Sequence, residues 1–396
     1  MIEGLEKRVT IVGAGPIGLY CAYLIKKNNP LVYVTVIEEH DCIGVPTNCT
    51  GHISITGFNK TKLSKLININ CCVINKIKGA YLFGPIKSKL KLKTHKNQTY
   101  VIDRSKFDNI IFNLAQTQNI EFLFNCQVYN VQNNVLKIRN LKSNVISDLN
   151  YDILVGADGP NSIIRKSMNI SNFKNKEFIQ TYQITANGDF DNKMVSIYYS
   201  KFSKNFFTWI VPESSNYARI GLGTKLGTNP KIAFYKFLEN NNLKLNHIRF
   251  SSSSLIPISK PLDTYCKNNK LIIGDASCFI KAISGGGINF GLISSEIAAQ
   301  TITNRLKNFK NLENYNKSIS KYKNELYLHY KIYKFLFSKT LVELDEFFIK
   351  CKTHGVEQFL QDHGEIDYLS TFIFKVILYP KLYGFIKDLF DFIKTK

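Results

Sequence analysis

Three glycines near the start of the chain have the spacing that binds a phosphate group. Gly13, Gly15 and Gly18 form a G-x-G-x-x-G segment between a short apolar stretch and a helical pattern. The first glycine permits a tight turn, the second lets the backbone approach a pyrophosphate, and the third lets helix and strand pack closely. Glu38 stands 20 residues after Gly18, where its carboxylate can accept hydrogen bonds from ribose hydroxyls. Together these residues predict a site for a nucleotide pyrophosphate.

Two further turns place an aspartate next to a glycine after a buried type of strand. Asp158 and Gly159 follow the apolar run Tyr151–Gly156, and Asp275 follows Leu271–Ile273. A carboxylate in such a turn can bind a sugar-like hydroxyl. A glycine run then leads into a helix, where backbone N–H groups can face the edge of a flavin ring and stabilise its negative charge. The members of this run are Gly285, Gly286, Gly287 and Ile288.

The chain around these residues alternates between strands and helices. Arg8–Val12 and Leu31–Ile37 are predicted strands, and Pro16–Lys27 between them has helical spacing, which makes a β-α-β unit. Ile288–Asn304 is predicted to be a helix. The chain from Cys42 to about Leu92 is predicted to be irregular because of its Gly, Pro and Asn residues.

The later part of the chain is predicted to contain a helix, then a run of strands, and then helices up to the end. Asp103 starts another predicted helix, and the adjacent Arg104 adds a cation that can meet phosphate or ribityl oxygens. Residues from about 178 to 258 are predicted to be strands broken by turns, and the chain from Asn311 onward is helical, Lys-rich and aromatic. The cofactor-like segments lie at both ends of the first 300 residues or so, which favours one interleaved domain with a β-rich insertion.

These segments resemble the FAD-dependent family that contains aromatic hydroxylases and geranylgeranyl reductases. The segments at Gly13, Asp103, Asp158 and Asp275 match that family in order and in approximate spacing across residues 8–300. The resemblance implies that FAD is the cofactor. By position it also implies what each residue contacts. Glu38 would hold the adenosine ribose, Arg104 the phosphate or ribityl region, and Asp275 the ribityl chain. Asp158 would lie near the pyrophosphate, and Gly285 to Gly287 would line the flavin.

Three segments resemble the geranylgeranyl reductase branch in particular. Ile43–Gly51 looks like its G-x-P-x-x-C-x-G segment, Phe207–Pro212 resembles its aromatic-x-Trp-x-aromatic-Pro motif, and Gly274–Ile288 resembles its Gly-Asp-Ala and Gly-Gly-Gly-Ile segment. The departures from the branch pattern are His52 for Gly, Val211 for an aromatic residue, Cys278 for a small residue and Ala282 for Pro.

The resemblance implies a reductase that saturates C=C bonds in geranylgeranyl chains of membrane ether lipids or prenyl diphosphates. Such a reaction delivers a hydride to one carbon and a proton to the other, in a dry apolar slot. Cys49 is a candidate proton donor or a small apolar residue beside the ring, and His52 is a second candidate proton shuttle. Trp209 either packs or lines the lipid cavity. The alternatives are an FAD monooxygenase resembling the aromatic hydroxylases and a flavoprotein that relays electrons to a quinone.

The expected fold class is α/β, α+β overall. A discontinuous Rossmann-type FAD-binding domain is expected over residues 1–175 and 260–305. A β-rich cap domain for the substrate is expected over 176–259, and a helical C-terminal region over 306–396. The composition, 44% hydrophobic and 21% charged, is close to globular averages and argues against wholesale disorder.

The chain is strongly basic, because 52 Lys and Arg against 30 Asp and Glu give a net charge of +22. Drift in residue usage explains much of this excess. An anionic membrane or an acidic electron carrier such as a ferredoxin is the expected partner, with NAD(P)H as the other electron donor. A nucleic-acid partner is not expected, because the Lys residues are scattered and no nucleic-acid-binding signature is present.

The cysteines and the termini bear on location. Nine cysteines, an odd number, with no leader segment before the first strand, favour a reducing, cytoplasmic compartment. No paired C-x-x-C is present, so no metal site is expected, and no apolar run is long enough to span a bilayer. The apolar positions of residues 382–393 predict an amphipathic helix, which either packs on the fold or lies on the inner face of the membrane.

Overall fold

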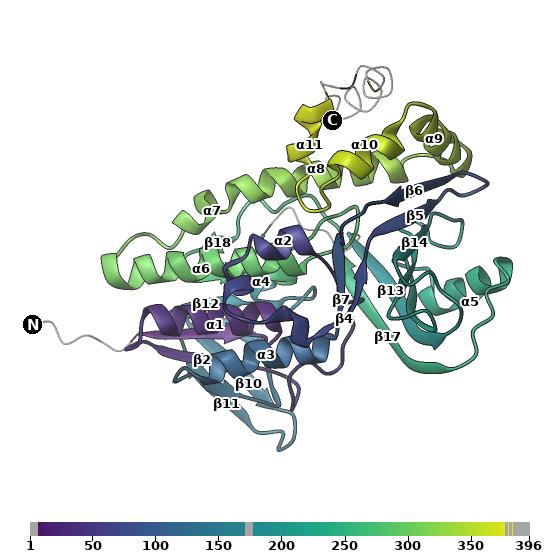
Figure 1. Cartoon of the computed structure of the whole chain (residues 1–396). Helices are drawn as coiled ribbons and strands as arrows, with labels where there is room; N and C mark the ends of the chain where they lie inside the picture. The colour runs from purple at the N-terminus through teal and green to yellow at the C-terminus, as the bar shows by residue number, and fades with distance from the viewer. Residues whose placement is uncertain (1–6, 171–176, 377–378, 380–381, 383–396) are drawn as a thin grey trace, which may run out of the picture.

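The computed structural model describes residues 7–170, 177–376, 379 and 382. The amphipathic segment predicted over 382–393 therefore lies outside the described residues, except for Leu382. The described chain forms two large sheets and a set of C-terminal helices that lie across them (Figure 1).

The first sheet confirms the predicted Rossmann-type fold. Its strand order is β18-β19-β12-β1-β2-β8, and β1, β2, β8, β12 and β19 run parallel. Nearly every residue of β1 and β2 is buried, as in sheets covered on both faces. The strands are β1 (Arg8–Val12), β2 (Tyr33–Ile37), β8 (Glu121–Leu123), β12 (Ile153–Gly156), β18 (Cys266–Lys267) and β19 (Lys270–Ile272).

Helix α1 (Pro16–Asn28) packs against both α3 (Arg104–Gln116) and α6 (Ile288–Asn308). Because parallel strands end at the same edge of a sheet, the residues after β1, β2, β12 and β19 converge there. The predicted cofactor residues are in these positions.

The second sheet is antiparallel apart from one pair of strands, and has the order β17-β13-β16-β15-β14-β5-β6. Its strands are β5 (Gly79–Phe83), β6 (Lys89–Lys93), β13 (Phe178–Asn187), β14 (Met194–Tyr198), β15 (Thr208–Pro212), β16 (Tyr217–Lys225) and β17 (Ile248–Pro257). We call it the cap sheet. Helix α5 (Pro230–Asn240) packs on β13 and β16.

The prediction that the chain from Cys42 to about Leu92 is irregular was wrong. This stretch contains β3 (His52–Ser54), α2 (Ile55–Asn59), β4 (Val73–Ile77), β5 and β6. The hairpin β5–β6 extends the cap sheet beyond residues 176–259, because β5 pairs in parallel with β14. The division into domains given above remains a prediction.

Smaller elements complete the description. The strands β3, β4 and β7 (Thr99–Ile102) form one small sheet, and β9 (Cys126–Gln132), β10 (Val135–Asn140) and β11 (Ile146–Asn150) form another. The remaining short elements are α4 (Ile163–Ser167) and the 3-10 turns at Lys62–Lys65, Ile69–Cys71 and Gly274–Ser277.

The described part of the C-terminal region, up to residue 376, is mostly helical. It consists of α7 (Asn314–Ser318), α8 (Ser320–Phe337), α9 (Leu341–Thr353), α10 (Val356–His363) and α11 (Ser370–Val376). Helices α9 and α10 pack against β6, so this region joins the cap sheet to the rest of the molecule (Figure 1). None of the helices in the described ranges has a stretch apolar and long enough to cross a bilayer.

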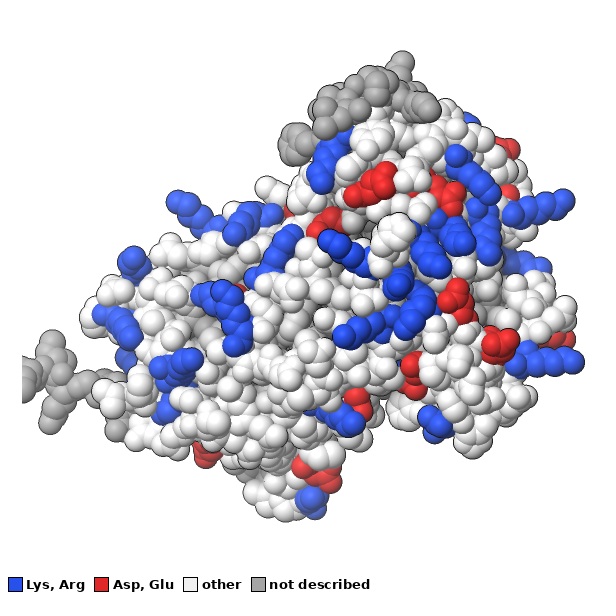
Figure 2. Space-filling model, in the orientation of Figure 1, with Lys and Arg blue, Asp and Glu red and all other residues white. Residues whose placement is uncertain are grey.

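Part of the basic excess gathers on one outer surface. Lys89, Lys91 and Lys93 alternate along β6 and are exposed, and the Lys89 ammonium lies 4.2 Å from the ring centre of Tyr81. Figure 2 shows basic side chains clustered where β4 to β7 lie in Figure 1. We call Lys89, Lys91 and Lys93 the lysine face.

Candidate active site

A cavity of about 1180 Å³ lies where the Rossmann-type sheet, the cap sheet and the C-terminal region meet. Ligand sites usually measure about 300–1,000 Å³, so this cavity has room for a cofactor and part of a substrate. Its lining contains every predicted site residue except Gly18. Those residues are Gly13, Gly15, Glu38, Cys49, His52, Arg104, Asp158, Gly159, Trp209, Asp275, Gly285, Gly286, Gly287 and Ile288.

The three glycines of the first turn have three different surroundings. Gly13 has a φ of 103°, and a Cβ atom there would collide with the backbone of Ala157. A Cβ atom at Gly18 would collide with the Gly13 carbonyl oxygen, so Gly18 serves helix packing outside the cavity. A Cβ atom at Gly15 would meet nothing within 4 Å. The backbone at Gly15 is therefore open to a phosphate group.

Glu38 holds this turn in place from the end of β2. Its Oε2 accepts a hydrogen bond from the Ala14 N–H at 2.8 Å, and its Oε1 accepts one from the His40 N–H at 3.0 Å. The carboxylate lines the cavity as well. Glu38 thus orders the glycine turn and is also placed to meet a ribose hydroxyl.

Two half-buried carboxyl groups, those of Asp158 and Asp275, line the cavity at the ends of β12 and β19. Asp158 Oδ2 accepts a hydrogen bond from the Ile163 N–H at 2.7 Å, whereas its buried Oδ1 has no partner among the described residues. Burial raises the pKa of both Asp158 and Asp275. The unpartnered oxygen of Asp158, beside the open backbone of Gly15 and Gly159, fits the hydroxyl and phosphate groups of FAD.

Arg104 lies beside the Cys49 thiol as well as beside a carboxylate. Its Nε and Nη2 each donate a hydrogen bond to Asp108, both at 3.0 Å. Burial lowers the pKa of Arg104, but Asp108 and Cys49 outweigh it and leave that pKa above its ordinary value. The Cys49 Sγ also accepts the Gly51 N–H at 3.3 Å. Two hydrogen-bond donors, Arg104 and the Gly51 N–H, therefore face this sulfur.

Arg219 ties the cap sheet to the turn that carries Cys49. Its Nη1 donates to the carbonyl oxygens of Thr50 and Ile102 at 2.6 and 3.0 Å, and its Nε donates to Glu213 at 2.7 Å. The sequence alone did not indicate this link, because Arg219 is 169 residues from Thr50 and 117 residues from Ile102 along the chain.

His52 is held as a neutral imidazole. Its Nε2 lies 2.6 Å from the Thr99 hydroxyl. Burial, with the nearby Lys281 ammonium, lowers the pKa of His52 to about 4, although Asp367 opposes the shift. The low pKa of His52 therefore favours its neutral form near neutral pH.

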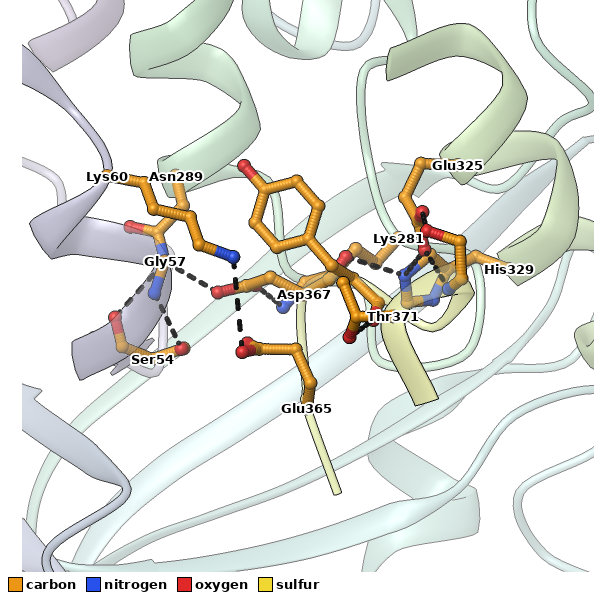
Figure 3. Close-up of polar contacts among 12 residues, drawn as sticks. Ser54, Gly57, Lys60, Lys281, Asn289, Glu325, His329, Glu365, Asp367 and Thr371 are labelled. Carbon is orange, nitrogen blue, oxygen red and sulfur yellow. Dashed lines mark hydrogen bonds and ion pairs between the residues drawn. The ribbon is translucent and has the colours of Figure 1, made fainter. Parts of the chain in front are cut away.

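A buried polar cluster that the sequence did not indicate lines the cavity next to the glycine run. Lys281 and Asp367 form a buried ion pair. Asn289 Nδ2 donates to Asp367 Oδ2 at 3.1 Å and to the Ser54 carbonyl oxygen at 3.2 Å. Figure 3 shows Asp367 between Asn289 and Ser54 on one side and His329 on the other.

This cluster joins the C-terminal region to the glycine run. The Lys281 N–H donates to the Gly286 carbonyl oxygen at 3.1 Å, and His329 Nε2 lies 3.1 Å from the Asp367 carbonyl oxygen. Burial and Lys281 lower the pKa of His329 to about 3. Lys281 and Asp367 are 86 residues apart, so no local pattern in the sequence pairs them.

The described part of the chain brings no three His, Cys, Asp or Glu side chains together as a metal site requires.

Comparison with known proteins agrees with this geometry. The family model described as an FAD binding domain matches residues 6–317. An uncharacterised protein of Methanocaldococcus jannaschii is 30% identical over 382 residues, covering 93% of this chain and 94% of that protein. A protein of Methanococcus vannielii named digeranylgeranylglycerophospholipid reductase is 25% identical over 320 residues, covering 75% and 78%.

A solved structure has the same fold. It is that of a geranylgeranyl bacteriochlorophyll reductase-like protein of Thermoplasma acidophilum, and it superposes with a TM-score of 0.79. The two chains are 22% identical, and the match covers 97% of this chain and 99% of the other.

Proposed function

The chain belongs to the FAD-binding-domain family and is an FAD-dependent oxidoreductase, and from that premise we propose that it saturates C=C bonds of isoprenoid chains. The substrate class is a geranylgeranyl ether lipid or a prenyl diphosphate. One observation carries the proposal: the Cys49 turn and the aromatic wall around Trp209 line the same cavity as the cofactor residues. The name of the Methanococcus vannielii relative supports the same substrate class.

The residues of the cofactor side would bind FAD through its phosphates and hydroxyls. Gly15 and the start of α1 would meet the pyrophosphate, and Asp158 would meet a hydroxyl through its unpartnered oxygen. Reduced FAD supplies a hydride when it is bound. Gly285 to Gly287 lie at the start of α6, where backbone N–H groups favour negative charge.

The residues of the substrate side would exclude water and supply the proton. The buried side chains of Phe206, Phe207 and Trp209 form an apolar wall for the carbon chain. The Cys49 S–H bond would break as a C–H bond forms on the second alkene carbon. Arg104 and the Gly51 N–H would stabilise the thiolate that remains until solvent returns a proton.

The test is anaerobic. Chemically reduced protein is mixed with a geranylgeranyl ether lipid, and flavin absorbance and lipid mass are followed. We expect reoxidation of the flavin and a product that has gained two hydrogen atoms per double bond. The fully saturated lipid is the control and should leave the flavin reduced. No reoxidation by either lipid, together with oxygen-dependent hydroxylation of an added aromatic compound, would overturn the proposal in favour of a monooxygenase.

We also propose that the lysine face contacts an anionic surface. Polybasic segments gain about 1 kcal/mol per Lys near an anionic membrane. The Lys89 ammonium lies over the rings of Tyr81 and Phe83. Replacing Lys89, Lys91 and Lys93 by Gln should therefore reduce sedimentation with phosphatidylserine vesicles and leave neutral vesicles unaffected. Equal sedimentation of the variant and the parent would contradict this contact.

NAD(P)H or an acidic ferredoxin-like carrier is the proposed electron donor.

A further inference from the structure

The cap sheet presents two rows of side chains to the cavity, and each row changes from aromatic to polar. In one row Trp209, Gly221 and Gln183 are register partners across β15, β16 and β13, and Ser252 on β17 comes next. In the other row Gly223, Thr181 and Ser254 are register partners. The Gly223 N–H donates a hydrogen bond to the Phe207 carbonyl oxygen at 3.1 Å, which places Phe207 at the aromatic end of this row. We call Thr181, Gln183, Ser252 and Ser254 the polar half of the cap sheet; all four line the cavity.

The absence of a side chain at Gly221 allows Trp209 on β15 to contact Gln183 on β13. A Cβ atom at Gly221 would overlap the indole ring of Trp209, so the ring lies across β16 only because this residue is glycine. The Trp209 Nε1–H thereby reaches Gln183 and donates to its Oε1 at 3.0 Å.

This hydrogen bond fixes the direction of the Gln183 amide. An indole N–H only donates, so the amide oxygen must face Trp209 and the NH₂ group must face away. Among the described residues the Gln183 side chain makes its hydrogen bond through Oε1 alone, and 6% of the residue is exposed. The NH₂ group therefore faces the cavity as a donor that no described side chain or backbone oxygen uses.

The polar half lies close to the glycine run. A Cβ atom at Gly285 would lie 3.1 Å from both Ile256 Cδ1 and Phe206 Cζ, so the run meets the cap sheet there. Ser254 is two residues before Ile256 on β17, so the two side chains face the same side of the sheet and are about 7 Å apart along the strand. Its register partner Thr181 donates to the Ser254 carbonyl oxygen at 3.2 Å.

We propose that the polar half binds an oxygen-bearing group of the substrate, with the Gln183 NH₂ group as the hydrogen-bond donor. This inference rests on the proposed function and assigns the part of the cavity that holds the polar end of the substrate. The carbon chain lies on the aromatic half, and a hydroxyl, ether or phosphate oxygen lies on the polar half. A purely hydrocarbon isoprenoid would leave the Gln183 donor unpaired and would bind more weakly.

The test measures binding to the oxidised, FAD-loaded protein through the change in flavin absorbance. Three ligands are compared: geranylgeranyl diphosphate, a geranylgeranyl glyceryl ether without phosphate, and a C20 isoprenoid hydrocarbon. The variants are Gln183→Leu and Thr181→Val, which keep approximate size. Ser253→Ala is the matched control, since Ser253 is exposed on the other face of β17.

We expect Gln183→Leu to bind at least one oxygen-bearing ligand about 10-fold more weakly and the hydrocarbon as the parent does. Loss for both oxygen-bearing ligands would assign the hydroxyl or ether oxygen, and loss for the diphosphate alone would assign the phosphate. Thr181→Val should show a smaller loss of the same kind, and Ser253→Ala none.

Two results would overturn the inference. Unchanged binding of all ligands by Gln183→Leu would show that the donor is not used, and an equal loss for the hydrocarbon would show that Gln183 only packs. Either result leaves the proposed function standing. If the parent protein binds no isoprenoid although FAD stays bound, the proposed function fails together with this inference.

Discussion

Replacing Asp367 by Asn removes the counter-charge of a buried ammonium group. Asp367 is 0% exposed, and the paired Lys281 is 6% exposed. Asn keeps the shape of the side chain and can still accept from Asn289, so the change is mainly the loss of charge. Breaking a buried pair by removing one partner costs about 3–5 kcal/mol, because the remaining charge is left buried and unpaired. We expect the free energy of unfolding to fall by that amount.

The assay is urea denaturation of the FAD-loaded protein, followed by flavin fluorescence and circular dichroism. Combining Asp367→Leu with Lys281→Met removes both charges and should recover most of the loss, since apolar replacement of a whole buried pair is often neutral. The control is Lys60→Met. Lys60 lies 4.0 Å from Glu365, its side chain is 44% exposed, and such a pair contributes about 0–1 kcal/mol. A loss for Asp367→Asn no larger than that of Lys60→Met would refute the reasoning.

Three other predictions follow from the site. Gly15→Leu should fold normally, because a Cβ atom there meets nothing within 4 Å, but should lose FAD; a yellow purified variant would contradict the assignment of the glycine turn. Cys49→Ala should keep its FAD and lose about 10²–10⁴-fold in turnover with the lipid, whereas the exposed control Cys71→Ala should match the parent; equal turnover of both would make Cys49 a spacer. Burial lowers the pKa of His52 to about 4 in the folded protein, whereas the unfolded chain protonates this imidazole below about pH 6.5. The unfolded state therefore binds more protons between these two values, and the free energy of unfolding falls as the pH falls below about 6.5. His52 should contribute about 2 kcal/mol of that loss by pH 5. Denaturation at pH 8 and pH 5 should show a smaller loss for His52→Gln, and an identical loss would exclude His52 as the cause.

The local parts of the cofactor site could be predicted from the sequence. The spacing of Gly13, Gly15 and Gly18 encodes a turn within one β-α-β unit, and Asp158 and Asp275 each follow directly on the strand that positions them. Such signals depend on neighbours in the chain, and the parallel sheet then brings their ends together.

Most of the parts that were missed depend on residues far apart in the chain, and the local exception is the hairpin β5–β6. The alternation of Lys and Leu in Lys89–Lys93 is a strand signal, but the surrounding Gly and Pro residues obscured it. Lys281 and Asp367 carry no local pattern, and their pairing follows from how the C-terminal region crosses the glycine run. The row that contains Gln183 needs the register of four strands, which a single sequence does not specify.

The Arg219 side chain couples the cap sheet to the turn that carries Cys49. Since it grips the carbonyl oxygens of Thr50 and Ile102 from β16, any tilt of the cap sheet carries the Cys49 thiol with it. The spacing between the thiol and the aromatic wall therefore depends on these hydrogen bonds as well as on the segments that connect the two parts. A change in the length of one connecting segment would therefore shift the thiol less than it would without Arg219.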